Sequence, residues 1–287
     1  MAALSDVGPP ESLADIVRRA LREDVGPGDW TTQWTVPAEA HASGRILARA
    51  DGVVAGLDAA REVFRQLDAD VRFDAERENG DAVGAEDVVA RLAGPARPIL
   101  TGERTALNLL QRLSGVATLT RAYVTAVNGT GTRILDTRKT TPGLRALEKA
   151  AVRAGGGVNH RSGLHDLVLI KENHIAIAGG IARALDAVLA VDRGGLDVEV
   201  ETRSLDEVRQ AIDAGARRIL LDNFEADQAA AAVSLGSDHG VRFEASGNMT
   251  PERAAAMARA GVHDVSVGAL THSAPALDLS LLLDGPP

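Results

Sequence analysis

From residue 133 onward, short apolar runs of β-strand type alternate regularly with helical segments. The apolar runs occupy 133–136, 167–171, 197–201, 218–222, 241–245 and 264–267. Strands that alternate with helices of about 10–15 residues are typical of βα units and a parallel sheet. This alternation restricts the fold more than any other feature, and it predicts an α/β protein.

Local signals mark where several helices begin and end. Ser204-Leu205-Asp206-Glu207 is a capping box, and its helix is expected to stop at Gly215. Thr250-Pro251-Glu252 begins another helix, with Gly261 just past its end. Residues 103–127 are helical and apolar on most sides, which predicts a buried helix that joins two domains.

Polar residues cluster at the carboxyl ends of the expected strands. They are Arg138-Lys139, Lys171, Glu201, Asp222, Ser246-Gly247 and Gly268. In a β/α barrel these ends converge on one mouth, whereas an open doubly wound sheet spreads them along a line. No Gly-x-Gly-x-x-Gly motif follows a first strand. We therefore favour the barrel over the open sheet.

The first third of the chain has a different pattern. Residues 43–100 alternate short β-like runs with glycine turns and contain one helical stretch at roughly 58–68, which indicates a small α/β domain. We expect an N-terminal domain at 1–105 and a barrel domain at 106–275. The tail at about 275–287 is expected to pack on the N-terminal domain.

Charge and composition narrow the possible ligands. Between residues 133 and 171, eight Arg or Lys stand against three Asp or Glu, in a protein of net charge −9. A positive focus in an acidic protein suits a small, highly charged anion better than a polyanion. The acidic balance and the single tyrosine predict that the chain does not bind nucleic acid.

The residues and segments that the chain lacks limit its possible metal ligands and its expected location. The chain has no cysteine, so any metal has to use oxygen or nitrogen ligands. Its N-terminus lacks a basic, apolar signal, and no apolar run approaches about 18 residues. We expect a cytoplasmic protein that does not enter a membrane.

The cations of the central region are candidate anion ligands. Arg138, Lys139, Arg161 and Lys171, together with His160, offer forked and point-like donors that suit carboxylates or phosphates. The alternative for any one of them is a solvated loop charge. That alternative is weakest for Lys171, which follows an apolar run and is expected at a buried strand end.

Carboxylates form a second group. Glu199 and Glu201 alternate along one strand and so face the same side, while Asp222 closes an apolar run. A carboxylate at such a strand end needs a partner or a role. Ribose contact, metal coordination and stabilisation of a cationic transition state are the functional readings, and a structural ion pair is the alternative.

Small residues follow the last two expected strands. Ser246-Gly247-Asn248 follows one strand and Gly268 follows the other. Small side chains there let backbone N–H groups approach a phosphate. A plain βα turn is the alternative.

No nucleophile is paired with a base, so electrostatic catalysis is favoured over covalent catalysis.

Taken with their spacing, these motifs resemble one family. The run Asp136-Thr137-Arg138-Lys139-Thr140, followed by Asn159-His160-Arg161, resembles the quinolinate phosphoribosyltransferases, also called nicotinate-nucleotide pyrophosphorylases (carboxylating). The similarity extends over almost the whole chain, from 23–29 to 267–273. It departs at Asn248, where relatives often have a second glycine, and at Glu172, where many have aspartate.

The resemblance implies an architecture and an assembly. The fold would be an incomplete TIM-like α/β barrel with an N-terminal α/β sandwich domain. The chain would form a homodimer or an assembly of dimers with shared active sites, in which Arg104 is donated to the partner's barrel.

The resemblance also implies an activity. The enzyme, a glycosyltransferase of NAD biosynthesis, would transfer phosphoribosyl from phosphoribosyl pyrophosphate to quinolinate with decarboxylation, and Mg²⁺ would accompany the pyrophosphate. Nicotinate mononucleotide, pyrophosphate and CO₂ would be the products. By residue matching, quinolinate and part of the second substrate would be held by Arg104, Arg138, Lys139, His160, Arg161 and Lys171. The ribose would face Glu201 and Asp222, which with Lys139 form the catalytic set, and the 5′-phosphate would be held by Ser246, Gly247, Asn248 and Gly268. No metal ligand is assigned.

Several rival readings remain at this point. Molybdenum-transport-associated homologues resemble the family along their length, and nicotinate phosphoribosyltransferases share a related barrel, but the dense cations favour a dicarboxylate. A non-catalytic carrier is a rival of another class, since residues 43–93 have a lipoyl-like pattern, but no lysine stands in the expected turn. A phosphosugar aldolase would need a Schiff-base lysine, for which Lys171 is the candidate.

Overall fold

The computed structural model describes residues 11–284, which fall into two compact units. The first unit takes the described parts of residues 1–118, 141–154 and 274–287, and the second takes 119–140 and 155–273. The expected boundary at 105/106 falls inside helix α4 (Ala96–Ala126). Residues 1–10 and 285–287 of the expected domains lie outside the described chain.

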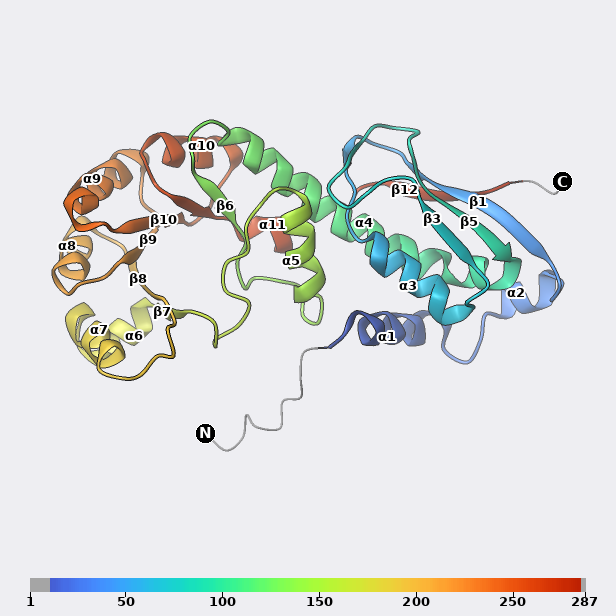
Figure 1. The fold of residues 1–287 in the computed structure, drawn as a ribbon, viewed down its shortest axis with the longest axis horizontal. Helices are drawn as coiled ribbons and strands as arrows, with labels where there is room; N and C mark the ends of the chain where they lie inside the picture. The colour runs from blue at the N-terminus through green and yellow to red at the C-terminus, as the bar shows by residue number, and fades with distance from the viewer. Residues whose placement is uncertain (1–10, 285–287) are drawn as a thin grey trace. The chain divides into compact units, whose positions relative to one another are not determined.

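The first unit is built on an antiparallel sheet of order β12-β1-β5-β3. Its strands are β1 (His41–Ala48), β3 (Arg72–Ala75), β5 (Val88–Pro95) and β12 (Leu279–Leu283), with a separate ribbon of β2 (Gly52–Val53) and β4 (Ala82–Val83). The C-terminal strand β12 pairs with β1, placing Leu281 opposite Ile46. The tail of the chain therefore forms an edge of the N-terminal sheet (Figure 1).

Helices complete this unit. They are α1 (Leu13–Val25), α2 (Trp30–Thr35), α3 (Leu57–Leu67), the first part of α4, and α5 (Arg145–Ala154). Helix α3 matches the predicted stretch at 58–68, and its Val63 and Phe64 are buried in the core. The ring of Phe64 stacks on that of Phe73 at 6.0 Å.

The second unit contains an all-parallel sheet of order β6-β11-β10-β9-β8-β7. The strands are β6 (Arg133–Leu135), β7 (Val168–Ile170), β8 (Val198–Thr202), β9 (Arg218–Asp222), β10 (Arg242–Ser246) and β11 (Asp264–Ser266). Each lies within one residue of its predicted limits, so the predicted α/β pattern is confirmed.

The strand order identifies the architecture as an incomplete barrel. Neighbours follow the chain from β7 round to β11, and β11 then pairs with β6, so the order never reverses as it would in a doubly wound sheet. Strands β6 and β7 do not pair with each other. Beside β6, the parallel bridge between Leu135 and Val158 extends the sheet by one residue. The predicted incomplete barrel with an N-terminal α/β domain is confirmed.

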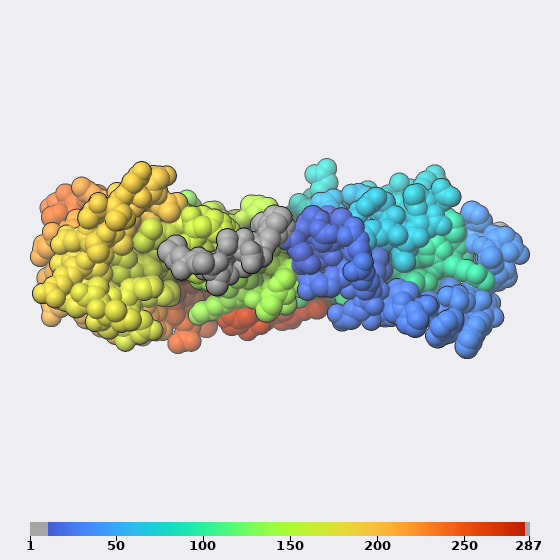
Figure 2. All heavy atoms as spheres, turned by 90° about the horizontal axis from the view of Figure 1, so that it is seen from below, coloured from blue at the N-terminus to red at the C-terminus, as the bar shows by residue number. Residues whose placement is uncertain are grey.

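Helices lie on the outside of this curved sheet (Figure 1). They are α6 (Glu172–Ala178), α7 (Ile181–Leu189), α8 (Leu205–Asp213), α9 (Ala226–Gly236) and α10 (Pro251–Arg259), with a 3₁₀ turn at Ser237–His239. The short helix α11 (Ala269–His272) lies at the strand ends instead, where Ala269 and His272 line the cavity described below. Residues of α6 and α7, in yellow, form part of the surface of the second unit that is visible in Figure 2. With the helices outside, the strand ends are left open at the mouth of the barrel.

The predicted helix signals act as expected. The Ser204 hydroxyl accepts the N–H of Glu207, and the Thr250 hydroxyl accepts that of Arg253, both at 3.2 Å. The Glu207 carboxylate accepts the N–H of Arg203, one residue before the cap. Glycines past these helices adopt the left-handed conformation that ends a helix, as at Gly215 (φ +88°).

Candidate active site

The carboxyl ends of the six parallel strands surround a cavity of about 500 Å³. Because all six strands run in the same direction, residues that follow them in distant parts of the sequence meet here. Every predicted site residue except Arg104 lines this cavity: Arg138, Lys139, His160, Arg161, Lys171, Glu201, Asp222, Ser246, Gly247, Asn248 and Gly268.

One part of the rim is cationic. Arg138 and Lys139 follow β6, and Arg161 follows the Val158 bridge at the open edge of the barrel. Burial and the positive charge of Arg138 lower the pKa of Arg161. The Nε of Arg138 is buried without a hydrogen-bond partner. Two guanidinium groups that repel each other and retain an unused donor form a site for an anion.

Lys171 departs from its expected burial. Its side chain is 49% exposed, because the residue caps helix α6 at the mouth instead of continuing β7 into the interior. Its Nζ lies 3.0 Å from Oε2 of Glu201. The N–H of Lys171 donates to Nδ1 of His174, so that histidine has a structural role.

The two predicted carboxylates differ in their partners. Glu201 is mostly buried and forms the ion pair with Lys171, so the structural reading applies to it in part. Asp222 ends β9 at the rim of the cavity. Among residues 11–284, no side chain forms a hydrogen bond or ion pair with the Asp222 carboxylate. Asp222 is therefore available to a ligand.

Close packing explains the small residues on the next part of the rim. Gly247 has φ +102°, and a Cβ there would lie 2.1 Å from Oδ1 of Asn223. At Gly268, a Cβ would lie 3.0 Å from Cδ of Lys139 and 3.1 Å from Nε2 of His272. Larger side chains would fill the space beside Lys139. Turns of this kind keep backbone N–H groups accessible, which suits a phosphate.

Buried polar side chains hold the cationic loops in place. Asp136 accepts the N–H of His160 at 2.8 Å and Nδ2 of Asn159 at 2.6 Å, which ties the two cationic motifs together. The buried Thr271 hydroxyl donates to the carbonyl of Lys139 at 2.9 Å. Neither role was predicted from the sequence, although an acid at the very end of the first barrel strand is a usable signal.

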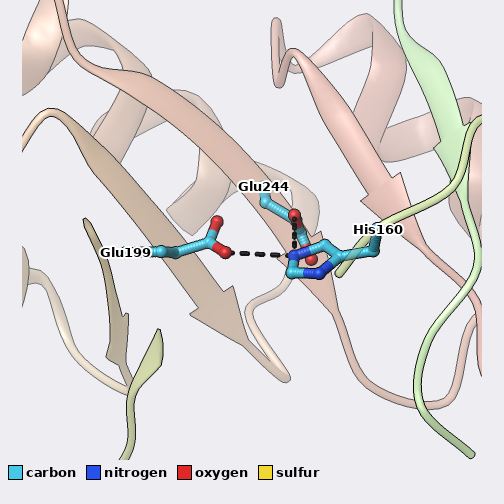
Figure 3. A group of neighbouring side chains, drawn as sticks. All are labelled: His160, Glu199 and Glu244. Atoms are coloured by element: carbon cyan, nitrogen blue, oxygen red, sulfur yellow. Dashed lines mark hydrogen bonds and ion pairs between the residues drawn. The ribbon is translucent and has the colours of Figure 1, made fainter. Parts of the chain in front are cut away.

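A second polar layer lies beneath the rim, where His160 meets Glu199 and Glu244 (Figure 3). Nε2 of His160 lies 3.1 Å from Oε2 of Glu199 and 3.2 Å from Oε2 of Glu244. Burial by itself lowers the pKa of His160, but the hydrogen bonds with both carboxylates outweigh it and raise the value to about 9. Burial and the charge of Glu199 raise the pKa of Glu244.

Glu244 was missed as a site residue. It stands in the middle of β10, where the alternation that turns Glu199 inward on β8 turns Glu244 inward as well. Within the described chain, these two glutamates and His160 are the one group of three potential metal ligands, with ligand atoms within 4.8 Å of one another.

Family comparisons agree with this geometry. The family model described as "Quinolinate phosphoribosyl transferase, C-terminal domain" matches residues 116–282, and the one described as the N-terminal domain matches residues 29–114. The chain belongs to the quinolinate phosphoribosyl transferase family.

Members of the quinolinate phosphoribosyl transferase family resemble the chain over nearly its full length. A protein of Synechocystis sp., named as a probable nicotinate-nucleotide pyrophosphorylase (carboxylating), is 45% identical over 95% of this chain and 93% of its own. The nicotinate-nucleotide pyrophosphorylase structure from Francisella tularensis has a TM-score of 0.89 at 41% identity, covering 95% of this chain and 96% of its own. NadC from Streptococcus pyogenes has a TM-score of 0.91 at 38% identity, covering 96% and 99%.

Arg104 is the one family-matched residue outside the cavity lining. It lies exposed on α4, in the first unit, and no described residue forms a hydrogen bond or ion pair with its side chain. Its expected donation to a partner subunit stays a prediction.

Within residues 11–284, no helix combines the length and apolarity needed to cross a bilayer.

Proposed function

We propose that this chain is a carboxylating nicotinate-nucleotide pyrophosphorylase. It transfers the phosphoribosyl group of phosphoribosyl pyrophosphate to quinolinate, and releases pyrophosphate and CO₂ to give nicotinate mononucleotide for NAD biosynthesis. The observation that carries this proposal is the single cavity in which cations, carboxylates and glycine turns meet. The names of the similar proteins agree with it.

The order of the strands suggests how the substrates lie. Going round the rim from β6, Lys139 comes first, then Gly268, the Ser246 turn, Asp222 and Glu201. The 5′-phosphate binds at the glycine turns, which places the ribose beside the two carboxylates. Quinolinate binds at the cations beside β6, where its two carboxylates meet Arg138 and Arg161.

Phosphoribosyl transfer develops positive charge on the ribose, whereas decarboxylation leaves an electron pair on the pyridine ring. The ring nitrogen of quinolinate forms a bond to C1 of the ribose while the bond from C1 to pyrophosphate breaks. Glu201 and Asp222 stabilise the positive charge that develops on the ribose. The alkylated ring is cationic, so it accepts the electron pair left when the adjacent carboxylate departs as CO₂, and that carbon then takes up a proton. The cations have to bind the leaving carboxylate without holding it in place.

Mg²⁺ is proposed to accompany phosphoribosyl pyrophosphate. Mg²⁺ prefers oxygen ligands and usually combines substrate phosphates with one or two carboxylates. Asp222 lies at the rim, and its carboxylate has no side-chain partner among residues 11–284, so it fits that role. The buried group around His160 does not, because it lies below the rim and includes an imidazole. When bound, the ion neutralises the charge of the departing pyrophosphate.

Assembly and location follow from the same proposal. We infer a homodimer, or an assembly of dimers, in the cytoplasm, with Arg104 reaching the cavity of the partner. The exposed and unpartnered guanidinium of Arg104 supports this arrangement. A subunit-mixing experiment tests it, and is described in the Discussion.

A parallel assay tests the activity. Purified protein is incubated with phosphoribosyl pyrophosphate and Mg²⁺, with quinolinate in one arm and nicotinate in the other, while nicotinate mononucleotide and CO₂ are followed. We expect equimolar mononucleotide and CO₂ from quinolinate and none from nicotinate. Product from nicotinate alone would assign the chain to nicotinate salvage. Absence of product from folded protein in both arms would favour a transport-associated homologue.

A further inference from the structure

Both ring nitrogens of His160 are engaged inside the protein. Nε2 faces Glu199 and Glu244 (Figure 3). Nδ1 accepts the backbone N–H of Arg161 at 2.7 Å. Only 7% of the His160 side chain is exposed. A histidine that binds a substrate carboxylate has to aim an N–H at it. Neither nitrogen of His160 is free to do so.

These contacts define the tautomer of the imidazole. A nitrogen that accepts an N–H has to keep its lone pair, so Nδ1 of His160 carries no proton and Nε2 carries one. That one N–H lies between the carboxylates of Glu199 and Glu244, both of which are almost fully buried. Two ionised carboxylates so close together repel each other, so one of them is expected to hold a proton.

The position of that proton follows from the surroundings. The cluster retains one extra proton near neutral pH, because the pKa values of both His160 and Glu244 are raised. The cluster holds the same total number of protons whether this proton lies on Nδ1 of His160 or on Glu244. Only a proton on Glu244 leaves Nδ1 free to accept the N–H of Arg161.

Charged groups on the neighbouring strands agree with an ionised Glu199. Arg218 on β9 places Nη2 3.9 Å from Oε1 of Glu199. Arg133 on β6 and Arg242 on β10 both pair with Asp264 on β11, at 2.7 and 2.6 Å. Arg218, which also lies 3.9 Å from Asp197, thus faces Glu199, and Arg161 and Arg242 add positive charge near it. A divalent metal ion in this cluster would add positive charge beside these arginines, which favours protons over a metal.

We propose that His160 is a positioning residue for Arg161 and not a ligand of the substrate. Ionised Glu199 and protonated Glu244 hold the imidazole inward as the Nε2–H tautomer. Its Nδ1 then holds the N–H of Arg161, and this fixes the direction in which the Arg161 side chain enters the cavity. The proposal differs from the expectation that His160 binds quinolinate directly, and it rests on the proposed function only in naming quinolinate as the ligand.

Nitrogen NMR of the full-length protein with ¹⁵N-labelled histidine tests the tautomer. The signals of His160 are assigned from a His160→Gln sample. We expect an unprotonated Nδ1 and a protonated Nε2 near neutral pH, and no change at Nδ1 when quinolinate is added to saturation. A protonated Nδ1, or a change at Nδ1 on binding, would overturn the proposal. So would stoichiometric metal in protein purified without chelators.

Two isosteric variants test the roles of the carboxylates. Glutamine mimics a protonated glutamate, so Glu244→Gln should raise the KM for quinolinate less than Glu199→Gln does. Glu199→Gln removes the ionised partner, and should raise that KM about tenfold, with the KM for phosphoribosyl pyrophosphate nearly unchanged. Equal effects of the two variants would refute the assignment of the proton to Glu244.

A matched control separates positioning from loss of stability. Asp264→Asn changes another buried acid of the barrel interior, one that pairs with Arg133 and Arg242 and not with His160. We expect it to lower Tm without raising the KM for quinolinate. If the wild type fails to use quinolinate, the proposed function fails, while the NMR measurement still decides the tautomer of His160.

Discussion

The carboxylate of Asp136 accepts the backbone N–H of His160 at 2.8 Å. This bond lies beside β6 on the side away from β11, where the bridge between Leu135 and Val158 extends the sheet by one residue. It joins the loop that carries Arg138 to the loop that carries Arg161. The two cations that would bind the carboxylates of quinolinate are therefore placed by one buried acid.

Asp136→Asn tests this link. Both oxygens of Asp136 accept N–H groups, from His160 and from Asn159. Asparagine turns one acceptor into a donor that faces another donor, so we expect unfolding to become easier by about 1–3 kcal/mol. We also expect kcat/KM for quinolinate to fall at least tenfold. Denaturant titration and steady-state kinetics measure the two effects, and normal kinetics would show that the loops keep their places without Asp136.

Arg138→Ala tests the cationic rim. Charged hydrogen bonds contribute roughly 1.5–3 kcal/mol each, so kcat/KM for quinolinate should fall by about one to two decades. Arg161→Ala should have a similar effect. Arg209→Ala is the matched control, because Arg209 forms an exposed i,i+3 ion pair with Asp206 on α8. Retention of full activity in Arg138→Ala would remove Arg138 from the site.

Gly247→Ala tests the phosphate turn. The added methyl group would clash with Asn223 at a position that already has φ +102°. The turn has to move, so we expect a raised KM for phosphoribosyl pyrophosphate. Gly215→Ala separates strain from contact, because Gly215 has φ +88° and nothing within 4 Å of the added Cβ. That control should cost about 1–2 kcal/mol of stability, and its KM should match wild type.

Stability should fall as pH rises from about 6.5 to about 9. The pKa of His160 is raised in the folded protein from 6.5 to about 9, so the cluster binds a proton that the unfolded chain releases earlier. The stabilisation is complete below 6.5 and is lost as pH rises through 9, by a few kcal/mol at most. Denaturant titrations at both ends of this range measure it. Glu244→Gln cannot hold the extra proton and should flatten the dependence; an equal slope in that variant would contradict this origin.

Subunit mixing tests the role of Arg104. Arg104→Ala and Lys139→Ala should each be nearly inactive, because each removes a cation from every site. If Arg104 acts in the partner's cavity, a mixed dimer has one intact site, so random mixing should restore about a quarter of wild-type activity. Mixing after reversible dissociation, with activity as the readout, checks this. If both residues served the same chain, no activity would return.

The course of the backbone was largely predictable from local pattern. Apolar runs bounded by polar strand ends gave the strands of the barrel to within one residue. Helix α4 is longer than expected and starts at Ala96, before Pro98. A proline in the first turn does not break a helix, because its missing N–H would have no helical partner there. The local pattern of that stretch instead predicts a continuation of the β-rich region that precedes it.

The residues that line the rim of the cavity could likewise be predicted from the sequence. The contacts of the buried layer around His160 could not. A residue that follows a parallel strand lies at the mouth whatever the details of packing, which is why Arg138, Asp222 and Gly247 line one cavity. Lys171 was expected to be buried and is half exposed, because helix α6 begins there.

The amino-acid sequence by itself therefore determined the strands, the kind of barrel and the chemistry of its mouth. Only the tertiary structure decided that His160 turns inward to Glu199 and Glu244, and that Asp136 joins the two cationic loops. Strand limits and strand ends are local properties, set by the alternation of side chains along a few residues. The inner contacts depend on how far the sheet curves, which brings β8 and β10 to one interior although some forty residues separate them in the sequence.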